Sequence, residues 1–212
     1  MPKIIPMVLG IDDHNGWANF ISVCMDRDMP RVIDNLWVSL LEEGIPNQPY
    51  HHETLDMDLQ SAEALIARVK ESAQKCALAE LKRVVIDTNA NFILRAIAIR
   101  KAPLSNLPST VREAHASRSV MFSADGMLYH HAVTEAAEKL GIGICIYDRE
   151  KIITQTAMAM HVDDDEFENM LATIGKKHGT AWRKEHRVAC AGAILALCGK
   201  SSNSNRGPGS TL

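Results

Sequence analysis

The pattern of apolar and polar residues over the first forty positions predicts three strands joined as an antiparallel meander. The first strand, Met7–His14, is apolar up to Ile11 and ends in two acids and a histidine. Asn15-Gly16 comes next, and this pair favours a two-residue hairpin turn because both central residues of such a turn need positive φ. The second and third strands are expected over Trp17–Met25 and Arg31–Leu41. The chain therefore begins with a hairpin that is extended by a third strand.

A helical period follows a loop over residues 42–55 that contains Gly44 and two prolines. Apolar residues recur at helical spacing from Ala62 to Ala77, with Asp58 or Ser61 as the N-cap, and the pattern runs on to about residue 85 with or without a break. The later predicted elements are a strand at Phe92–Arg100, a short helix near Thr110–Arg118, a helix from Ser123 to a Gly141 C-cap, a strand at Ile142–Asp148, and helices from Asp163 to Gly179 and from Arg183 to Cys198.

This order of elements predicts an α/β fold. A meander followed by strands with helical crossovers gives a five-stranded mixed sheet, antiparallel first and then parallel, with helices on both faces. We expect Met7–His14 to be central and the two later strands to run parallel to it. The strand Ile142–Asp148 is continuously apolar, which favours burial on both of its faces.

Composition places the chain among ordinary globular proteins, with 46% apolar and 23% charged residues. We expect one domain over residues 1–200 and a disordered tail over Ser201–Leu212, which has no apolar anchor. The net charge of −3 excludes a global basic field for nucleic-acid binding and leaves only a local basic patch. Five cysteines without a CxxC pair, no signal-peptide pattern and no membrane-length apolar run predict reduced thiols, a cytoplasmic location and no membrane partner.

The acids at the end of the first strand are the first candidate site. Alternation places Asp12 and His14 on one face and Asp13 on the other, and the two-residue turn places Asp12 opposite Asn19 and His14 opposite Trp17. Asp12 and His14 together offer an oxygen and a nitrogen ligand, which Zn²⁺ or Mn²⁺ would accept. The alternative is a polar strand end, in which Asp13 satisfies turn amides and His14 stacks on a tryptophan.

Two further clusters add candidate metal ligands. His51, His52 and Glu53 lie together in the loop after the third strand, and the alternative is a surface loop without a role. Glu185 and His186 open the last helix, where the helix dipole alone favours an acid. Motifs for phosphate-binding loops and nucleophile elbows (GxxxxGK[ST], GxGxxG and GxSxG) do not occur in the sequence.

Two stretches, together with the order of elements, carry a family resemblance. Leu9-Gly10-Ile11-Asp12 resembles the opening strand of the Holliday-junction-resolvase branch of the ribonuclease H-like superfamily, and residues 186–197 resemble its small-residue final helix. The resemblance implies that Asp12 holds a catalytic divalent metal, Mg²⁺ or Mn²⁺ with Zn²⁺ as a further option. The family also has a Glu at the end of the fourth strand and acids in the final helix. This chain has Ile99-Arg100-Lys101 and the non-acidic Val188–Ala191 there, so Glu185 and His186 are the nearest substitutes.

Two functions follow from this resemblance. One is a metal-dependent phosphodiester hydrolase acting on structured nucleic acid, with Asp12, Asp13, Glu185 and His186 as catalytic groups. Phosphate contacts would come from the basic residues Arg95, Arg100, Lys101, Arg183 and Lys184. The other is a non-catalytic scaffold or partner-binding domain of the same fold. In both cases the last helix is expected to pack beside the first strand and to bring Glu185 and His186 towards Asp12.

Overall fold

Five strands form one mixed sheet in the computed structural model, which describes residues 4–87, 91–104, 106–177 and 182–199. The sheet has the order β3–β2–β1–β4–β5, so β1 is central as predicted. Its strands are β1 (Ile5–His14), β2 (Trp17–Asp26), β3 (Met29–Ser39), β4 (Phe92–Arg100) and β5 (Gly143–Tyr147). The first three are antiparallel, β4 runs parallel to β1, and β5 runs parallel to β4. The predicted five-stranded mixed sheet is confirmed, whereas the predicted tail lies outside the described residues.

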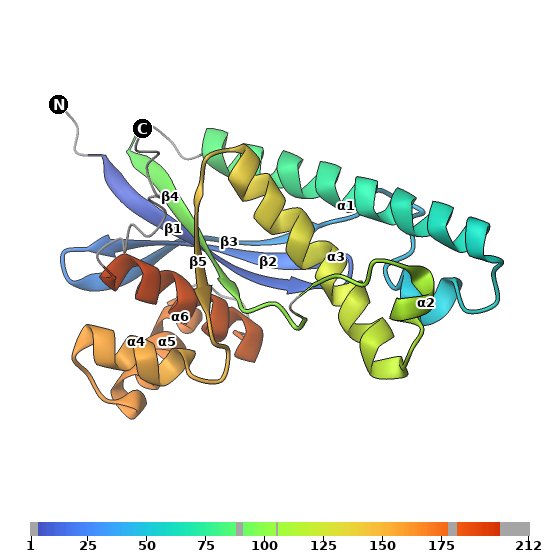
Figure 1. The fold of residues 1–212 in the computed structure, drawn as a ribbon. Coiled ribbons are helices and arrows are strands. Elements are labelled where there is room, and N and C mark those ends of the chain that lie inside the picture. Colours follow the sequence, from blue (N-terminus) through green and yellow to red (C-terminus); the bar gives the residue numbers. More distant parts are fainter. Residues whose placement is uncertain (1–3, 88–90, 105, 178–181, 200–212) are drawn as a thin grey trace, which may run out of the picture.

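Helices lie on both faces of the sheet (Figure 1). One face carries α1 (Leu59–Asp87) and α3 (Arg118–Lys139), which pack on each other, with the short η1 (Pro49–Glu53) and α2 (Val111–Ala114) at their ends. The other face carries α6 (Lys184–Cys198), which contacts β1, β2 and β4 and is backed by α4 (Ile152–Met160) and α5 (Asp164–Lys177). The central strand is therefore covered on both faces, by α1 and α3 on one and by α6 on the other.

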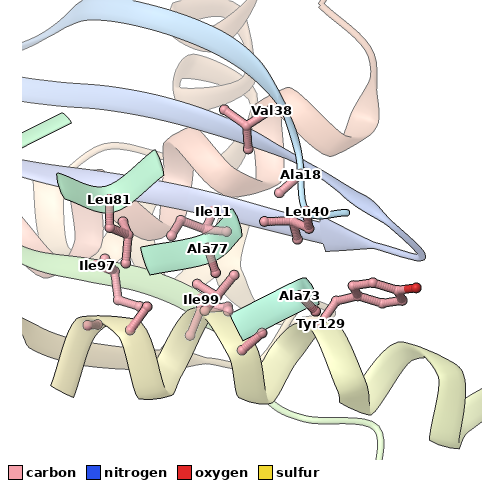
Figure 2. Close-up of a cluster of buried hydrophobic side chains, with 14 of the residues drawn as sticks. Ile11, Ala18, Val38, Leu40, Ala73, Ala77, Leu81, Ile97, Ile99 and Tyr129 are labelled. Atoms are coloured by element: carbon pink, nitrogen blue, oxygen red, sulfur yellow. The ribbon is translucent and has the colours of Figure 1, made fainter. Parts of the chain in front are cut away.

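Large side chains fill the core between the sheet and the α1–α3 face. Ile11 of β1 and Ile97 and Ile99 of β4 are fully buried there against Leu81 of α1 and Tyr129 of α3 (Figure 2). Each such side chain contributes about 1.5–3 kcal/mol through removal of apolar surface from water. This face follows the odd-numbered residues of β1, as the period of two requires.

In the opposite core, which also holds large side chains such as Ile21 and Ile194, small residues bring α6 close to the sheet. A Cβ atom on Gly10 would lie 2.0 Å from the backbone oxygen of Ala189 and 3.3 Å from the Cβ of Ala193. A Cβ on Gly192 would likewise lie 2.4 Å from the ring of Tyr147 on β5. Glycine at these two positions therefore lets α6 lie directly on the central strand and lets the Tyr147 ring lie on α6.

Some elements differ from those predicted. β5 is an edge strand with Ile146 65% exposed, so the prediction that it is buried on both faces is wrong. An apolar run indicates that a segment favours a strand, but it does not indicate whether another strand pairs with its outer edge in the sheet. The helix expected from Ser123 begins at Arg118, because the Ser117 hydroxyl accepts a hydrogen bond from the Val120 amide and caps it. α1 is unbroken, and α4 was not predicted.

Candidate active site at the carboxyl end of β1

The hairpin register places Asp12 and His14 as the sequence predicts. Asp12 lies opposite Asn19 and His14 opposite Trp17, with Gly16 at φ +86° in the turn. His14 Nε2 is hydrogen-bonded to Asp12 Oδ2. The imidazole also stacks on Trp17, with ring centroids 4.0 Å apart and planes 10° from parallel. His14 therefore stacks on Trp17, as the alternative of a polar strand end expects, and it also lies beside Asp12, as a shared metal site would require.

Asp13 lies on the opposite face and contacts two basic side chains, Arg100 and His130. Arg100 Nε donates to its Oδ1 at 3.1 Å and Arg100 Nη2 donates to its Oδ2 at 3.2 Å. His130 Nδ1 of α3 lies 3.4 Å from Oδ2. Burial opposes ionisation of Asp13, but His130 and Arg100 outweigh it and hold the pKa of the carboxyl below its ordinary value. Asp13 thus anchors β4 and α3 to the end of β1 instead of satisfying turn amides.

Asp12 has a different environment. Its side chain is fully buried, and its Oδ1 has no hydrogen-bond partner among the described residues. Two other buried polar atoms of this region, the Tyr147 hydroxyl and His186 Nδ1, also lack a partner in the described part of the chain. Burial, followed by the charges of Asp12 and Asp13, raises the pKa of Tyr147. A buried carboxylate oxygen without a donor is costly, so this arrangement is that of a site for a cation or a hydrogen-bond donor.

The N-terminus of α6 is directed towards Asp12. Ala189 lies on Gly10, so one helical turn back leads to Glu185 and His186 while two residues along β1 lead to Asp12. A hydrogen bond with its own backbone, and then the charges of Arg149, His14 and His186, lower the pKa of Glu185. The pKa of His186 is lowered by burial, although the charges of Glu185 and Asp12 oppose this shift. The structure therefore brings Asp12, His14, Glu185 and His186 into one electrostatic environment in which His186 is neutral near pH 7.

The cluster His51–Glu53 lies elsewhere, in η1. The backbone amides of Tyr50 and His51 donate to the two carboxylate oxygens of Asp125 on α3, at 2.9 and 3.1 Å. The ring of His51 contacts His52 and accepts a hydrogen bond from Arg118 Nε at 3.1 Å. These contacts hold His51 against α3 with His52 on its ring, and the structure does not bring η1, which also carries Glu53, to Asp12. An acid in a mostly apolar helical segment was the available sequence signal for Asp125.

An open pocket of about 510 Å³ adjoins the site at the carboxyl ends of β1 and β4. Arg100 and Arg149 contribute its cationic side chains, while Trp17 and Phe122 contribute aromatic surface. The remaining lining residues are Asp13, His14, Asn15, Asn47, Gln48, Pro103, Ser123 and Gly126. Ligands of open α/β sheets bind at this end of the strands, so the pocket is where such folds place their chemistry.

Sequence reasoning missed several residues that shape this region. It gave no role to His130, whose ring lies beside Asp13, and it offered Arg100 for phosphate contacts although its guanidinium holds Asp13. Tyr147 and Arg149 received no role. The only signal for Tyr147 was a polar tip at the end of an apolar strand. Pairings between distant elements cannot be read from residues that are separate in sequence.

The candidate site lacks a complete set of metal ligands among the described residues. Across the residues that the structure describes, no three His, Cys, Asp or Glu side chains are arranged to hold a metal ion. The unpartnered Asp12 Oδ1, with the neutral His186 near it, fits one divalent ion that completes its coordination with substrate or water. A pair of metals does not fit, because two metals need several free carboxylates. The end of β4 supplies Arg100 instead of an acid, and the Arg100 guanidinium is bonded to the carboxylate of Asp13.

The strand order and the two helical layers define a ribonuclease H-like fold. Known structures with this fold include Thermus thermophilus RuvC, which aligns with a TM-score of 0.52 and 14% identity over 91% of this chain and 93% of that chain. T. thermophilus RuvC in complex with a Holliday junction substrate aligns with a TM-score of 0.51 and 14% identity over 91% and 92% of the two chains. No protein-family model matches the sequence, and no curated protein matches it significantly. None of the described helices is long and apolar enough to cross a membrane.

Proposed function

We propose that this protein is a metal-dependent phosphodiester hydrolase that acts on structured nucleic acid, with Asp12 as its main metal ligand. The observation that carries the proposal is the fully buried carboxylate of Asp12 with an unpartnered Oδ1 at the end of the central strand. A divalent cation there would offset the cost of burying that charge. The similarity in fold to RuvC, one structure of which holds a Holliday junction, supports branched or otherwise structured nucleic acid as the substrate class.

Each group near Asp12 has a proposed role. Asp12 binds the metal, and His14, Glu185 and His186 bind it or orient its ligands. A bound divalent ion would neutralise phosphate charge and promote ionisation of a nucleophilic water. The neutral imidazole of His186 is able to accept a proton, and the Tyr147 hydroxyl is able to donate a hydrogen bond to a phosphate oxygen.

Basic residues around the site would contact the phosphate backbone. Arg149 is exposed after β5, and Arg183 and Lys184 are exposed at the start of α6. The charge of Arg149 acts on Glu185, and that of Arg183 acts on His186, so both cations lie close to the proposed catalytic groups. Cations placed in this way bind phosphates without reading sequence. This matches a protein of net negative charge that has a local basic patch.

A non-catalytic nucleic-acid-binding domain is the second candidate. It is favoured by the ion pair of Arg100 with Asp13 and by the lack, among the described residues, of three ligands arranged for a metal. Under this alternative, Asp12 would complete the strand end and the basic residues would bind phosphates without cleavage. The two candidates differ in whether a metal binds at Asp12.

Thermal melting with metals tests the proposal. We expect Mn²⁺ or Mg²⁺ at about a hundred times its dissociation constant to stabilise the wild-type protein by about 2.7 kcal/mol, a rise in Tm of roughly 5–10 °C. Asp12→Asn should abolish this rise, together with divalent-dependent cleavage of a labelled four-way junction. Asp28→Asn, in the exposed turn after β2, is the matched control and should keep both.

The result that would overturn the hydrolase is specific. Identical melting curves of the wild-type protein with Mn²⁺, Mg²⁺, Zn²⁺ and chelator, and no cleavage, would leave the non-catalytic domain as the function. Binding of the junction in chelator would then distinguish a nucleic-acid-binding domain from a scaffold without this ligand.

A further inference from the structure

Three aromatic rings form a row on the α6 face of the sheet, beginning at the candidate site. His14 stacks on Trp17, and Trp17 stacks on Trp37 of β3 with centroids 6.2 Å apart and planes 25° from parallel. The strand register explains the row, since Trp17 pairs with Ser39 and Asn19 pairs with Trp37, which makes the two tryptophans diagonal neighbours. We name Trp17 and Trp37 the tryptophan platform.

The outer end of the platform is open to solvent. Trp37 is 64% exposed, whereas the side chain of His14, which adjoins Trp17 at the other end of the row, is 29% exposed. α6 contacts β1, β2 and β4, and Trp37 lies beyond these strands on β3. A large aromatic ring exposed next to a second, nearly parallel ring offers a π-face on which another flat ring can stack.

Beyond His14, the platform adjoins the pocket that is lined by Arg149, one of the proposed phosphate-binding residues. His14 is hydrogen-bonded to Asp12, and Trp17 lines the same pocket as Arg100 and Arg149. Phe122 also lines this pocket and is 56% exposed. A ligand that contacts the platform and the pocket together must combine a flat aromatic part with an anionic part.

We infer that the tryptophan platform stacks an unpaired nucleobase of the nucleic acid and so places the adjoining phosphodiester at Asp12. This inference rests on the proposed function and adds the part of the substrate that is recognised. Paired bases in a duplex hide their faces in the stack, whereas unpaired bases at junctions, bulges and single strands expose them. Stacking of one base on an aromatic side chain tolerates every sequence, because every base has a π-face. The platform therefore selects nucleic-acid structure and not nucleotide sequence.

Binding measured in chelator tests the platform separately from catalysis. The probes are a fluorescent twelve-nucleotide oligothymidine, a blunt duplex, and the same duplex with a two-nucleotide bulge. We expect Trp37→Ala to weaken binding of the oligothymidine and the bulged duplex by about tenfold or more, and binding of the blunt duplex by less than about twofold. Trp37→Phe keeps a π-face and should recover part of the loss. Met158→Ala, which removes a side chain that is 70% exposed on α4, is the matched control and should bind all three probes like wild type.

Tryptophan emission gives a second readout. Trp182 is the third tryptophan of the chain, so the Trp182→Phe variant reports on the platform alone. We expect oligothymidine to quench this emission. Equal losses on all three probes, no loss in Trp37→Ala, or no quenching would overturn the platform while leaving nucleic-acid binding in place. Failure of the wild-type protein to bind any of these probes or the four-way junction, both in chelator and with Mg²⁺, would overturn the proposed function as well.

Discussion

Asp12 and Asp13 are consecutive and both are buried, but they lie on opposite faces of β1 and have different partners. Asp13 faces Arg100, which pairs with its charge, and the ring of His130. Asp12 faces the α6 side, where His14 contacts one oxygen and the other oxygen lacks a partner in the described part of the structure. The difference teaches that burial of an acid alone does not mark a functional group. Whether both carboxylate oxygens have hydrogen-bond partners is what distinguishes a structural acid from one available for ligand binding.

The same contrast extends to packing. On the face of Asp13 the sheet packs on side chains of α1 and α3, among them Leu81 and Tyr129, whereas on the face of Asp12 the backbone of α6 lies against Gly10. Close packing there holds the N-terminus of α6 at a fixed distance from Asp12. The small residues of this face are thus as important to the site as its charged residues.

The largest expected effect comes from disturbing that close contact. Gly10→Val would place side-chain atoms into the backbone of Ala189, so α6 would have to move away. We expect the free energy of unfolding to fall by about 3 kcal/mol or more, measured by urea denaturation. The matched control is Gly126→Ala in α3, where the nearest atom to a new Cβ is 3.8 Å away. Alanine there should be neutral or stabilise by up to about 1 kcal/mol, and a tolerated valine at position 10 would refute the packing argument.

The next effect compares the two acids directly. Asp13→Asn leaves the Arg100 guanidinium without its counter-charge and replaces the oxygen beside His130, and we expect a loss of about 2–3 kcal/mol in unfolding free energy. Asp12→Asn removes a buried charge that lacks a full set of partners, so in chelator it should leave stability unchanged or raise it. Urea denaturation of both variants in the same buffer measures the difference. Equal losses would show that the two acids are equally structural.

A smaller effect concerns Asp125, which anchors η1 to α3. Burial raises the pKa of Asp125 to about 7, although the amides of Tyr50 and His51 oppose this shift. The unfolded carboxyl titrates near pH 4, so the folded state binds more protons between about pH 4 and 7 and stability falls as the pH rises through this range. Asp125→Asn cannot ionise and has only one accepting oxygen, so it loses one backbone hydrogen bond at every pH. Its unfolding free energy relative to wild type should nevertheless rise by on the order of 2 kcal/mol as the pH goes from 5 to 8. Denaturation midpoints at several pH values measure this, with the exposed Asp56→Asn as the control. Parallel curves for wild type and Asp125→Asn would contradict it.

The sequence predicted the sheet because its signals are local and strong. Asn15-Gly16 fixed the hairpin and its pairs, and Phe92–Arg100 was bounded correctly by residue type and the proline after it. The position of α6 beside β1 was expected from the order of elements and from the apolar body of the helix, whereas the role of Gly10 in this contact came only with the structure. The expectation that Glu185 and His186 approach Asp12 used the same argument.

The candidate site was less predictable because it depends on side chains from elements far apart in the chain. Arg100 and His130 are 87 and 117 residues beyond Asp13, and neither carries a local mark of its partner. The adjacent histidines His51 and His52 looked like ligands, but the fold directs them to α3. Type and spacing identify candidates, whereas their partners are decided by tertiary packing.

The two-residue turn between β1 and β2 has a consequence for recognising distant relatives. An inserted residue would shift the pairing of His14 with Trp17 and move one of them to the other face. The five-residue interval from Asp12 to Trp17 should therefore be constant in any chain that keeps both the acid and the stacked ring. The loop between β3 and α1 is free of this constraint and should vary in length. Conservation of that short interval, and not overall sequence identity, is what would identify distant relatives of this protein.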